Sequence, residues 1–233
     1  MKVVGLIGGM SWESTVPYYQ VINRTVAQHL GGLHSAKILL YSVDFDEIEA
    51  MQREGRWDDA GVALAEVAQR LQHAGADFLV LCTNTMHKVA SAIESRVSIP
   101  LLHIADPTAH AITQAGWRTA GLLGTSFTME QDFYSTRLAQ HGIATIVPPP
   151  EDRAVVHRVI YEELCRGRVL DESRRAYRRI IDGLARRGAQ CIILGCTEIA
   201  LLVRPSDADI PLFDTAALHA RAAALRALDA DTT

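Results

Sequence analysis

The sequence predicts an α/β protein of two homologous lobes, each with a mostly parallel sheet flanked by helices. Short apolar runs alternate with longer helical patterns, which is typical of parallel strands joined by crossover helices. Two of these runs, one in each half of the chain, end in the same dipeptide, Cys82-Thr83 and Cys196-Thr197. Other short motifs recur in the same order, and such self-similarity indicates a duplication.

The repeat extends beyond the cysteines. Gly5-Leu6-Ile7-Gly8 recurs as Gly121-Leu122-Leu123-Gly124, and Ile99-Pro100-Leu101 recurs as Ile210-Pro211-Leu212. We expect the Ile-Pro-Leu segments to be strands that pass between the lobes. The predicted N-terminal lobe therefore holds residues 1–98 plus 209–233, and the C-terminal lobe holds residues 99–208. The duplication then places the two cysteine loops opposite each other across a pseudo-twofold axis.

The N-terminal lobe opens with a strand that runs into a glycine-rich turn, Gly8-Gly9-Met10-Ser11. The pattern then predicts a helix, a strand, a short helix, a long amphipathic helix and a buried strand, over residues 13–30, 36–43, 44–53, 57–74 and 78–81. Glycines let the backbone approach a ligand closely. The turn is not a dinucleotide fingerprint, because its spacing is G-x-x-G-G and no acidic residue follows where a ribose would need one.

Composition excludes several classes of function. Of 233 residues, 48% are apolar and 21% are charged, and the formal net charge is −4. The arginines between positions 174 and 179 are expected to form a solvated helix face, so no nucleic acid is expected as a partner. No apolar run approaches the ~18 residues that span a bilayer, and no signal peptide is recognisable. Four cysteines without a secretory context indicate reduced thiols and a cytoplasmic protein.

Cys82 and Cys196 are the candidate catalytic residues. Each follows a strand that is expected to be central in a parallel sheet, and ligands of open α/β sheets bind outside the carboxyl ends of the strands. A thiol titrates near ~8.5 and a helix N-terminus lowers this value, so one cysteine is expected to be thiolate while the other stays thiol. Two thiols facing one carbon suit two-base racemisation or epimerisation. Cys165 and Cys191 have no repeat partner and are expected in the core.

Polar groups near both thiols are expected to hold an α-carboxylate, into which charge on the α-carbon can spread. They are Thr83, Asn84 and Thr85 in the lobe of Cys82, and Thr197 and Glu198 in the other lobe. Met10 and Ser11 are expected to line the cleft, with Thr125 and Ser126 opposite them. Helix capping is the alternative role for these hydroxyls. His87 and His103 are expected to be ordinary polar contacts, with a proton relay as the alternative. No Cys/His spacing resembles a zinc site, so no metal is expected.

Four segments together resemble the aspartate/glutamate racemase family, and the match runs essentially end to end. These segments are Gly8-Gly9-Met10-Ser11-Trp12-Glu13-Ser14-Thr15, Cys82-Thr83-Asn84-Thr85-Met86-His87-Lys88, Phe127-Thr128-Met129-Glu130-Gln131-Asp132-Phe133-Tyr134 and Leu194-Gly195-Cys196-Thr197-Glu198-Ile199. The resemblance implies two pseudo-symmetric Rossmann-like lobes with the active site in the cleft between them, no cofactor, and a homodimer.

The resemblance also implies residue roles. Cys82 and Cys196 would be the acid/base pair, and Gln52 and Tyr161 would reach the substrate. Arg53 and Arg166 lie beside these two residues in sequence and are weaker candidates for binding a distal carboxylate. Some family members replace the first cysteine with threonine and act with one handedness, so the presence of both cysteines indicates a full racemase.

The leading functional hypothesis is interconversion of L- and D-aspartate or glutamate, a small-molecule substrate, without pyridoxal phosphate or metal. Neither Lys37 nor Lys88 has a phosphate-binding glycine loop beside it. Racemisation of other amino acids, including basic ones, is the alternative among enzymes. A non-catalytic redox or ligand-binding protein with a reversible disulfide between its facing thiols is the alternative from another class, although no Cys-x-x-Cys motif is present.

Overall fold

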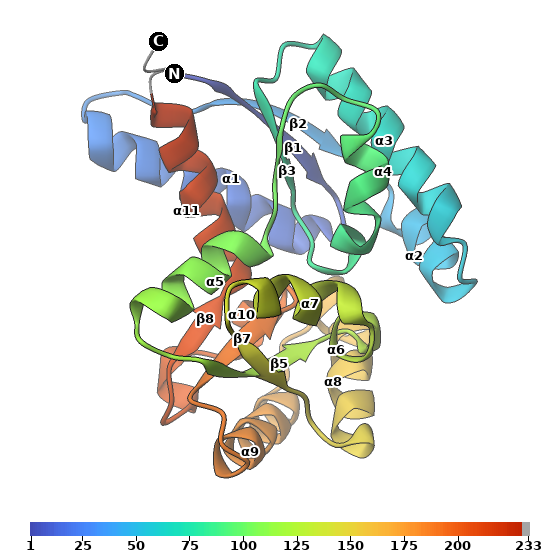
Figure 1. Ribbon diagram of the computed structural model, residues 1–233, viewed down its shortest axis with the longest axis vertical. Coiled ribbons are helices and arrows are strands. Elements are labelled where there is room, and N and C mark those ends of the chain that lie inside the picture. The colour runs from blue at the N-terminus through green and yellow to red at the C-terminus, as the bar shows by residue number, and fades with distance from the viewer. Residues whose placement is uncertain (230–233) are drawn as a thin grey trace. The chain divides into compact units, whose positions relative to one another are not determined.

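The computed structural model describes residues 1–229, which form two compact units (Figure 1). Unit 1 comprises Met1–Ile104 and the chain from His219 on, and unit 2 comprises Ala105–Leu218. Each unit contains a four-stranded parallel sheet, and corresponding strands follow the same order in both sheets. The prediction of a two-lobed α/β fold with parallel sheets is confirmed.

The sheet of unit 1 has the order β2-β1-β3-β4. Its strands are β1 (Val3–Gly8), β2 (Lys37–Ser42), β3 (Phe78–Leu81) and β4 (Leu101–Leu102). The two central strands are apolar and almost wholly buried, as expected for parallel strands covered on both faces. Ile7 of β1 is paired with Leu81 and with Tyr41, so the carboxyl ends of the three strands lie side by side.

Helices cover both faces of this sheet. Those on one side are α1 (Trp12–Leu30) and α11 (Thr215–Leu228), and those on the other are α3 (Trp57–His73) and α4 (Ala90–Glu94) (Figure 1). A short helix, α2 (Phe45–Arg53), follows β2, and the 3₁₀ helix η1 (Thr85–Val89) follows β3. Helix α3 packs an apolar face on the sheet, and its ends carry acidic residues in the first turn and basic residues in the last, which matches the helix dipole.

Unit 2 repeats this arrangement with the strand order β6-β5-β7-β8. Its strands are β5 (Thr119–Gly124), β6 (Ala144–Ile146), β7 (Cys191–Gly195) and β8 (Leu212–Asp214). Its helical elements are α5 (Ala105–Gln114), α6 (Ser126–Glu130), α7 (Asp132–Gln140), α8 (Pro150–Glu162), η2 (Leu164–Arg166), α9 (Asp171–Arg186), α10 (Ile199–Leu202) and η3 (Pro205–Asp207). Within residues 1–229, none of the helices combines the length and the apolar character that a membrane span needs.

The Ile-Pro-Leu segments stay within one unit each. Leu101 of β4 pairs with Leu79 in unit 1, and Leu212 of β8 pairs with Ile192 in unit 2. The unit boundaries therefore fall after these strands, at 104/105 and 218/219, whereas the sequence predicted 98/99 and 208/209. The reason is hydrogen bonding, because each segment satisfies backbone groups of the preceding strand, as in the bond from the Leu79 N–H to the Pro100 carbonyl.

Candidate active site

Cys82 follows β3 directly and is completely buried. Its backbone N–H donates to the Ile7 carbonyl at 2.9 Å, which places the residue at the carboxyl edge of the sheet. The thiol donates to the Val80 carbonyl over an Sγ–O distance of 3.8 Å. Burial raises the pKa of Cys82 well above its ordinary value. The expected lowering by a helix N-terminus is wrong here, because the loss of solvent outweighs any effect of the short η1.

The polar loop after Cys82 is buried as well. Thr83, Asn84 and Thr85 have exposed fractions of 6%, 2% and 5%. Side chains of these types are mostly exposed in proteins, so a buried run of three is unusual. Within the described chain, the Asn84 side chain makes no capping bond to η1, so capping does not account for its position. The Thr83 carbonyl lies 2.7 Å from Nδ1 of His87.

The glycine-rich turn is held by Thr15. The Gly9 N–H donates to the Thr15 hydroxyl at 2.9 Å, and this hydroxyl donates to the Ser11 carbonyl at 2.9 Å. Gly9 has a φ of +95°, and a Cβ at this position would collide with the backbone of Val43. The glycine therefore permits a close approach of two backbone segments. Met10 and Ser11 are both buried beside the end of β1.

Two neighbouring residues of α2 have different surroundings. Gln52 is buried, and its amide Nε2 donates to the Met86 sulfur at 2.9 Å, so it lies against η1. The side chain of Arg53 is 66% exposed and pairs with Glu49 at 3.2 Å. The structure therefore brings Gln52 next to the loop that follows Cys82, whereas Arg53 is directed to the surface of the helix.

Cys196 follows β7 in unit 2 and is also buried, but its thiol has a charged partner. The thiol donates to the carboxylate Oε2 of Glu198 at 2.9 Å, and the hydroxyl of Thr197 donates to the same oxygen at 2.9 Å. Burial raises the pKa of Cys196 well above its ordinary value, and the negative charge of Glu198 raises it further. The sequence-based expectation of a lowered thiol pKa is thus wrong in this unit too. Glu198 itself is 1% exposed.

The end of β5 carries the counterpart of the glycine-rich turn. Thr125 caps α6, because its hydroxyl accepts a bond from the Thr128 N–H at 3.3 Å. The Ser126 N–H donates to Nδ1 of His157, on α8, at 3.1 Å. Tyr161, one turn further along α8, packs its ring on His157 with a centroid distance of 4.8 Å. The capping alternative therefore holds for Thr125, and His157 is a contact that the sequence did not indicate.

The remaining candidates of unit 2 lie near η2 and on β7. Arg166 is exposed at the end of η2. Cys191 opens β7 and is buried, and burial raises its pKa from 9.0 to about 11. Cys165 is half-buried and packs against the cluster that contains Cys196, as a core residue would. Glu163, a second buried carboxylate, accepts a 2.6 Å bond from the Ser173 hydroxyl.

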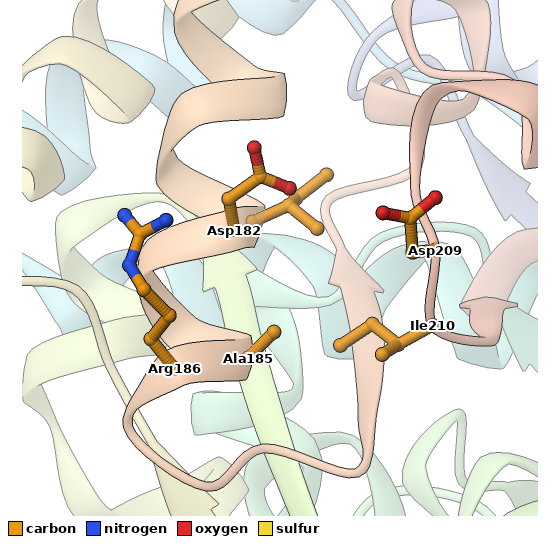
Figure 2. Close-up of a pocket in the computed structure, with 6 residues that line it drawn as sticks. Asp182, Ala185, Arg186, Asp209 and Ile210 are labelled. Atoms are coloured by element: carbon orange, nitrogen blue, oxygen red, sulfur yellow. The ribbon is translucent and has the colours of Figure 1, made fainter.

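Two surface pockets lie away from the cysteines. One, of about 320 Å³, lies between the C-terminal half of α9, which carries Asp182 and Arg186, and the segment of Asp209 and Ile210 that precedes β8 (Figure 2). It is therefore at the amino edge of the unit 2 sheet, whereas Cys196 lies at the carboxyl edge. The other, of about 220 Å³, is lined by the end of β2 and by α2 and α3. Neither pocket is lined by a residue predicted for the site.

Comparison with known proteins finds the same fold in solved structures that are described as racemases or racemase homologues. A crystal structure of a candidate Asp/Glu racemase from Yersinia pestis is 59% identical, with a TM-score of 0.91 over 98% of this chain and 100% of that one. An aspartate racemase homologue from Pyrococcus horikoshii OT3 is 31% identical, with a TM-score of 0.82 over 98% and 100% of the two chains.

A curated relative has a broader description. The broad specificity amino-acid racemase RacX of Bacillus subtilis (strain 168) is 22% identical over 94% of this chain and 95% of its own length. The model of the Asp/Glu/Hydantoin racemase family matches residues 7–223, which include both cysteine loops. Because this match spans nearly the whole sequence, the chain belongs to the Asp/Glu/Hydantoin racemase family.

Proposed function

We propose that this protein interconverts the L and D forms of aspartate or glutamate by two-base proton transfer between Cys82 and Cys196. The observation that carries the proposal is the equivalence of the two thiols, since each directly follows the strand third in the order of its sheet, β3 or β7. Family membership supports racemisation as the reaction. The 31% identity to an aspartate racemase homologue supports an acidic substrate.

The proposed step conserves atoms and electrons. A thiolate takes the α-proton from one face of the substrate, so the Cα–H bond breaks and an S–H bond forms. The electron pair left on Cα spreads into the α-carboxylate. The second thiol then donates its proton to the opposite face, which forms a new C–H bond and leaves a thiolate. The reaction needs no oxidant, reductant or cofactor.

One thiol must lose its proton before the step begins. Burial raises the pKa of both thiols in the ligand-free protein, which favours their neutral forms. Glu198 is the acceptor in contact with the Cys196 thiol, at 2.9 Å. In the proposal Glu198 therefore receives the Cys196 proton when the substrate binds, whereas Cys82, which faces a backbone carbonyl, gives its proton to solvent.

Substrate recognition is proposed for the buried polar groups beside the thiols. Thr83, Asn84 and Thr85 supply donors for one side of the α-carboxylate, and Thr197 supplies a hydroxyl for the other. Arg53 and Arg166 are the candidates for the distal carboxylate. Replacing the arginine that binds the distal carboxylate by methionine is expected to raise the KM for aspartate and glutamate more than the KM for alanine.

The decisive experiment uses Cys82→Ser and Cys196→Ser. Each variant is expected to lose racemisation, measured by chiral chromatography, because serine is too weak an acid and base near neutral pH. Each should still exchange the α-proton of one enantiomer with solvent deuterium, and the two variants should prefer opposite enantiomers. Near wild-type racemisation by either variant would contradict the two-base assignment. Loss of activity on dialysis with chelator, restored by pyridoxal phosphate, would contradict the cofactor-independent mechanism.

A broader substrate range is the second candidate. It is favoured by the 22% identity to a broad specificity amino-acid racemase, which extends over nearly the full length of both chains. A panel of D- and L-amino acids, assayed by chiral chromatography, separates the two candidates. Activity on lysine or arginine without activity on aspartate would replace the acidic-substrate proposal.

A further inference from the structure

A cluster of aromatic side chains lies behind the loop that follows Cys82, all within unit 1. His87 is 4% exposed, and its ring centroid lies 4.3 Å from that of His103 and 6.0 Å from that of His219. His219 in turn lies 2.9 Å, Nδ1 to hydroxyl oxygen, from Tyr18. The proposed two-thiol reaction involves none of these rings, so it does not explain why they are buried together.

The partners of His87 determine its protonation and its tautomer. The Ile104 N–H donates to Nε2 of His87 at 3.2 Å, so Nε2 carries a lone pair and no proton. Nδ1 lies 2.7 Å from the Thr83 carbonyl, which can only accept, so Nδ1 must donate. Only the neutral imidazole with its proton on Nδ1 satisfies both contacts.

One of these bonds acts next to Cys82. The Thr83 carbonyl belongs to the peptide group that joins Thr83 to Asn84. Because a trans peptide is planar, with its C=O and N–H pointing in opposite directions, fixing the carbonyl also fixes the Asn84 N–H. His87 therefore sets the orientation of the first peptide group beyond the Cys82–Thr83 bond, in the loop proposed to hold the substrate.

The other bond acts where the chain leaves unit 1. Ile104 is the last residue of unit 1 before unit 2 begins. The same segment is held a second time, because Nε2 of His219 lies 2.8 Å from the Leu102 carbonyl. His219 is itself the first residue of unit 1 after the chain returns. The rings of His87 and His219 are therefore bonded to the segment where the chain leaves unit 1, and His219 is also the residue at which the chain returns to unit 1.

We propose that His87 is a positioning residue that ties the substrate loop beside Cys82 to the crossing segment at Ile104. It touches neither the reacting atoms nor the substrate in this role. The inference rests on the proposed function in one respect, namely that the loop it orients serves proton transfer by Cys82. The link between Thr83 and Ile104 through the imidazole is independent of the reaction.

Two amide variants separate the two bonds. Asparagine places its amide the same number of bonds from Cβ as Nδ1, so His87→Asn can keep the Thr83 contact and lose the Ile104 contact. Glutamine places its amide oxygen where Nε2 lies, so His87→Gln can keep the Ile104 contact and lose the Thr83 contact. His29→Asn is the matched control, because Nδ1 of His29 also contacts the carbonyl four residues before it, at 2.8 Å, on the exposed end of α1.

The first readout is NMR of the protein without substrate. In the wild type, the ¹⁵N shifts of His87 are expected to show a protonated Nδ1 and an unprotonated Nε2. Amide hydrogen exchange at Ile104 is expected to speed up about tenfold in His87→Asn, since a buried N–H loses its acceptor, and to change little in His87→Gln and His29→Asn. The opposite tautomer, or unchanged exchange at Ile104 in a folded His87→Asn, would overturn the link.

The second readout is the primary deuterium isotope effect for each enantiomer labelled at Cα. His87→Gln loses the bond beside Cys82, so proton transfer at Cys82 should become slower relative to transfer at Cys196. The isotope effect is then expected to rise for the enantiomer that Cys82 deprotonates and to fall for the other, whereas a loss of folded enzyme leaves both unchanged. Exchange of the α-proton with solvent deuterium by Cys82→Ser and Cys196→Ser identifies the enantiomer that each cysteine deprotonates.

The outcomes distinguish this inference from the proposed function. If the cysteine variants behave as proposed but both isotope effects of His87→Gln match the wild type, His87 is not a positioning residue for Cys82. If a cysteine variant still racemises, the two-base reaction fails, while the tautomer and the Ile104 exchange still report on the link itself.

Discussion

The two cysteine loops occupy the same place in their sheets, yet their thiols have different partners. Cys82 faces a backbone carbonyl at 3.8 Å, whereas Cys196 faces the Glu198 carboxylate at 2.9 Å. A carbonyl can only accept a weak thiol hydrogen bond, whereas a carboxylate can also take the proton. The two repeats therefore share the position of the thiol but differ in the group that accepts the hydrogen bond from it.

The largest effect on this difference is expected from Glu198→Gln. Removing the negative charge should lower the pKa of Cys196, because that charge raises it now, while the pKa of Cys82 should stay as it is. Loss of the proton acceptor should reduce racemisation about 100-fold. The pH dependence of iodoacetamide labelling at each cysteine, read by mass spectrometry, measures the first effect.

Glu163→Gln is the control for this experiment, because it neutralises another buried carboxylate of unit 2 that is bonded to Ser173. Equal losses of activity in the two variants would mean that Glu198 acts only through the stability of the unit. If the pH dependence of Cys196 labelling is the same in Glu198→Gln as in the wild type, Glu198 does not raise the pKa of Cys196.

The turns at the ends of β1 and β5 differ as well, and Gly9→Ala tests the first of them. Gly9 has a positive φ and lies against the backbone of Val43, so alanine should lower the free energy of unfolding by about 3 kcal/mol. Gly31→Ala is the control, since Gly31 also has a positive φ, +72°, but no atom lies within 4 Å of its Cβ position. Equal losses in urea unfolding would show that packing against Val43 contributes nothing.

Cys191 extends the comparison to a buried thiol on the same strand as Cys196. Burial raises its pKa from 9.0 to about 11, so folding favours the neutral thiol. The resulting stabilisation is fully present below pH 9 and is lost as the pH rises from about 9 to about 11, a change of about 3 kcal/mol. Cys191→Ala should therefore show a shallower loss of unfolding free energy over this range. Parallel curves for the wild type and the variant would contradict the shift.

The smallest effect is expected at the counterpart of Gly9. Thr125 caps α6 through its hydroxyl, so Thr125→Ala should lower the free energy of unfolding by about 1 kcal/mol. Thr136→Ala, at an exposed position of α7, serves as the reference for a threonine without this role. If the two variants unfold at the same denaturant concentration, the cap is not a significant source of stability.

Much of the fold could be predicted because its signals are local. The apolar runs ending at Cys82 and Cys196 identify the central strands, and the repeated Gly-x-x-Gly motif identifies β1 and β5. The boundaries of the units could not be predicted from the sequence. They depend on the sheet that Leu101 joins, and the sequence does not show that Leu101 pairs with Leu79 in unit 1.

The polar contacts of the site were the least predictable part. Glu198 lies only two residues from Cys196, but the sequence does not reveal whether its carboxylate turns back to the thiol. His157 lies 31 positions from the Ser126 N–H that it accepts, and a histidine on an amphipathic helix gives no sign of such a partner. The raised pKa values of Cys82 and Cys196 follow mainly from burial, and at Cys196 also from the charge of Glu198, and a strand-end position alone implies neither.

The insertion of one unit into the other has a consequence for synthesis of the chain. Helix α11 packs in unit 1, where the Ala227 carbonyl accepts a 2.9 Å bond from the Lys2 N–H. The ribosome therefore releases all of residues 105–218 before it releases the part of α11 that completes the first unit. During translation all residues of unit 2 are therefore available before unit 1 is complete, although the strands of unit 1 are synthesised first.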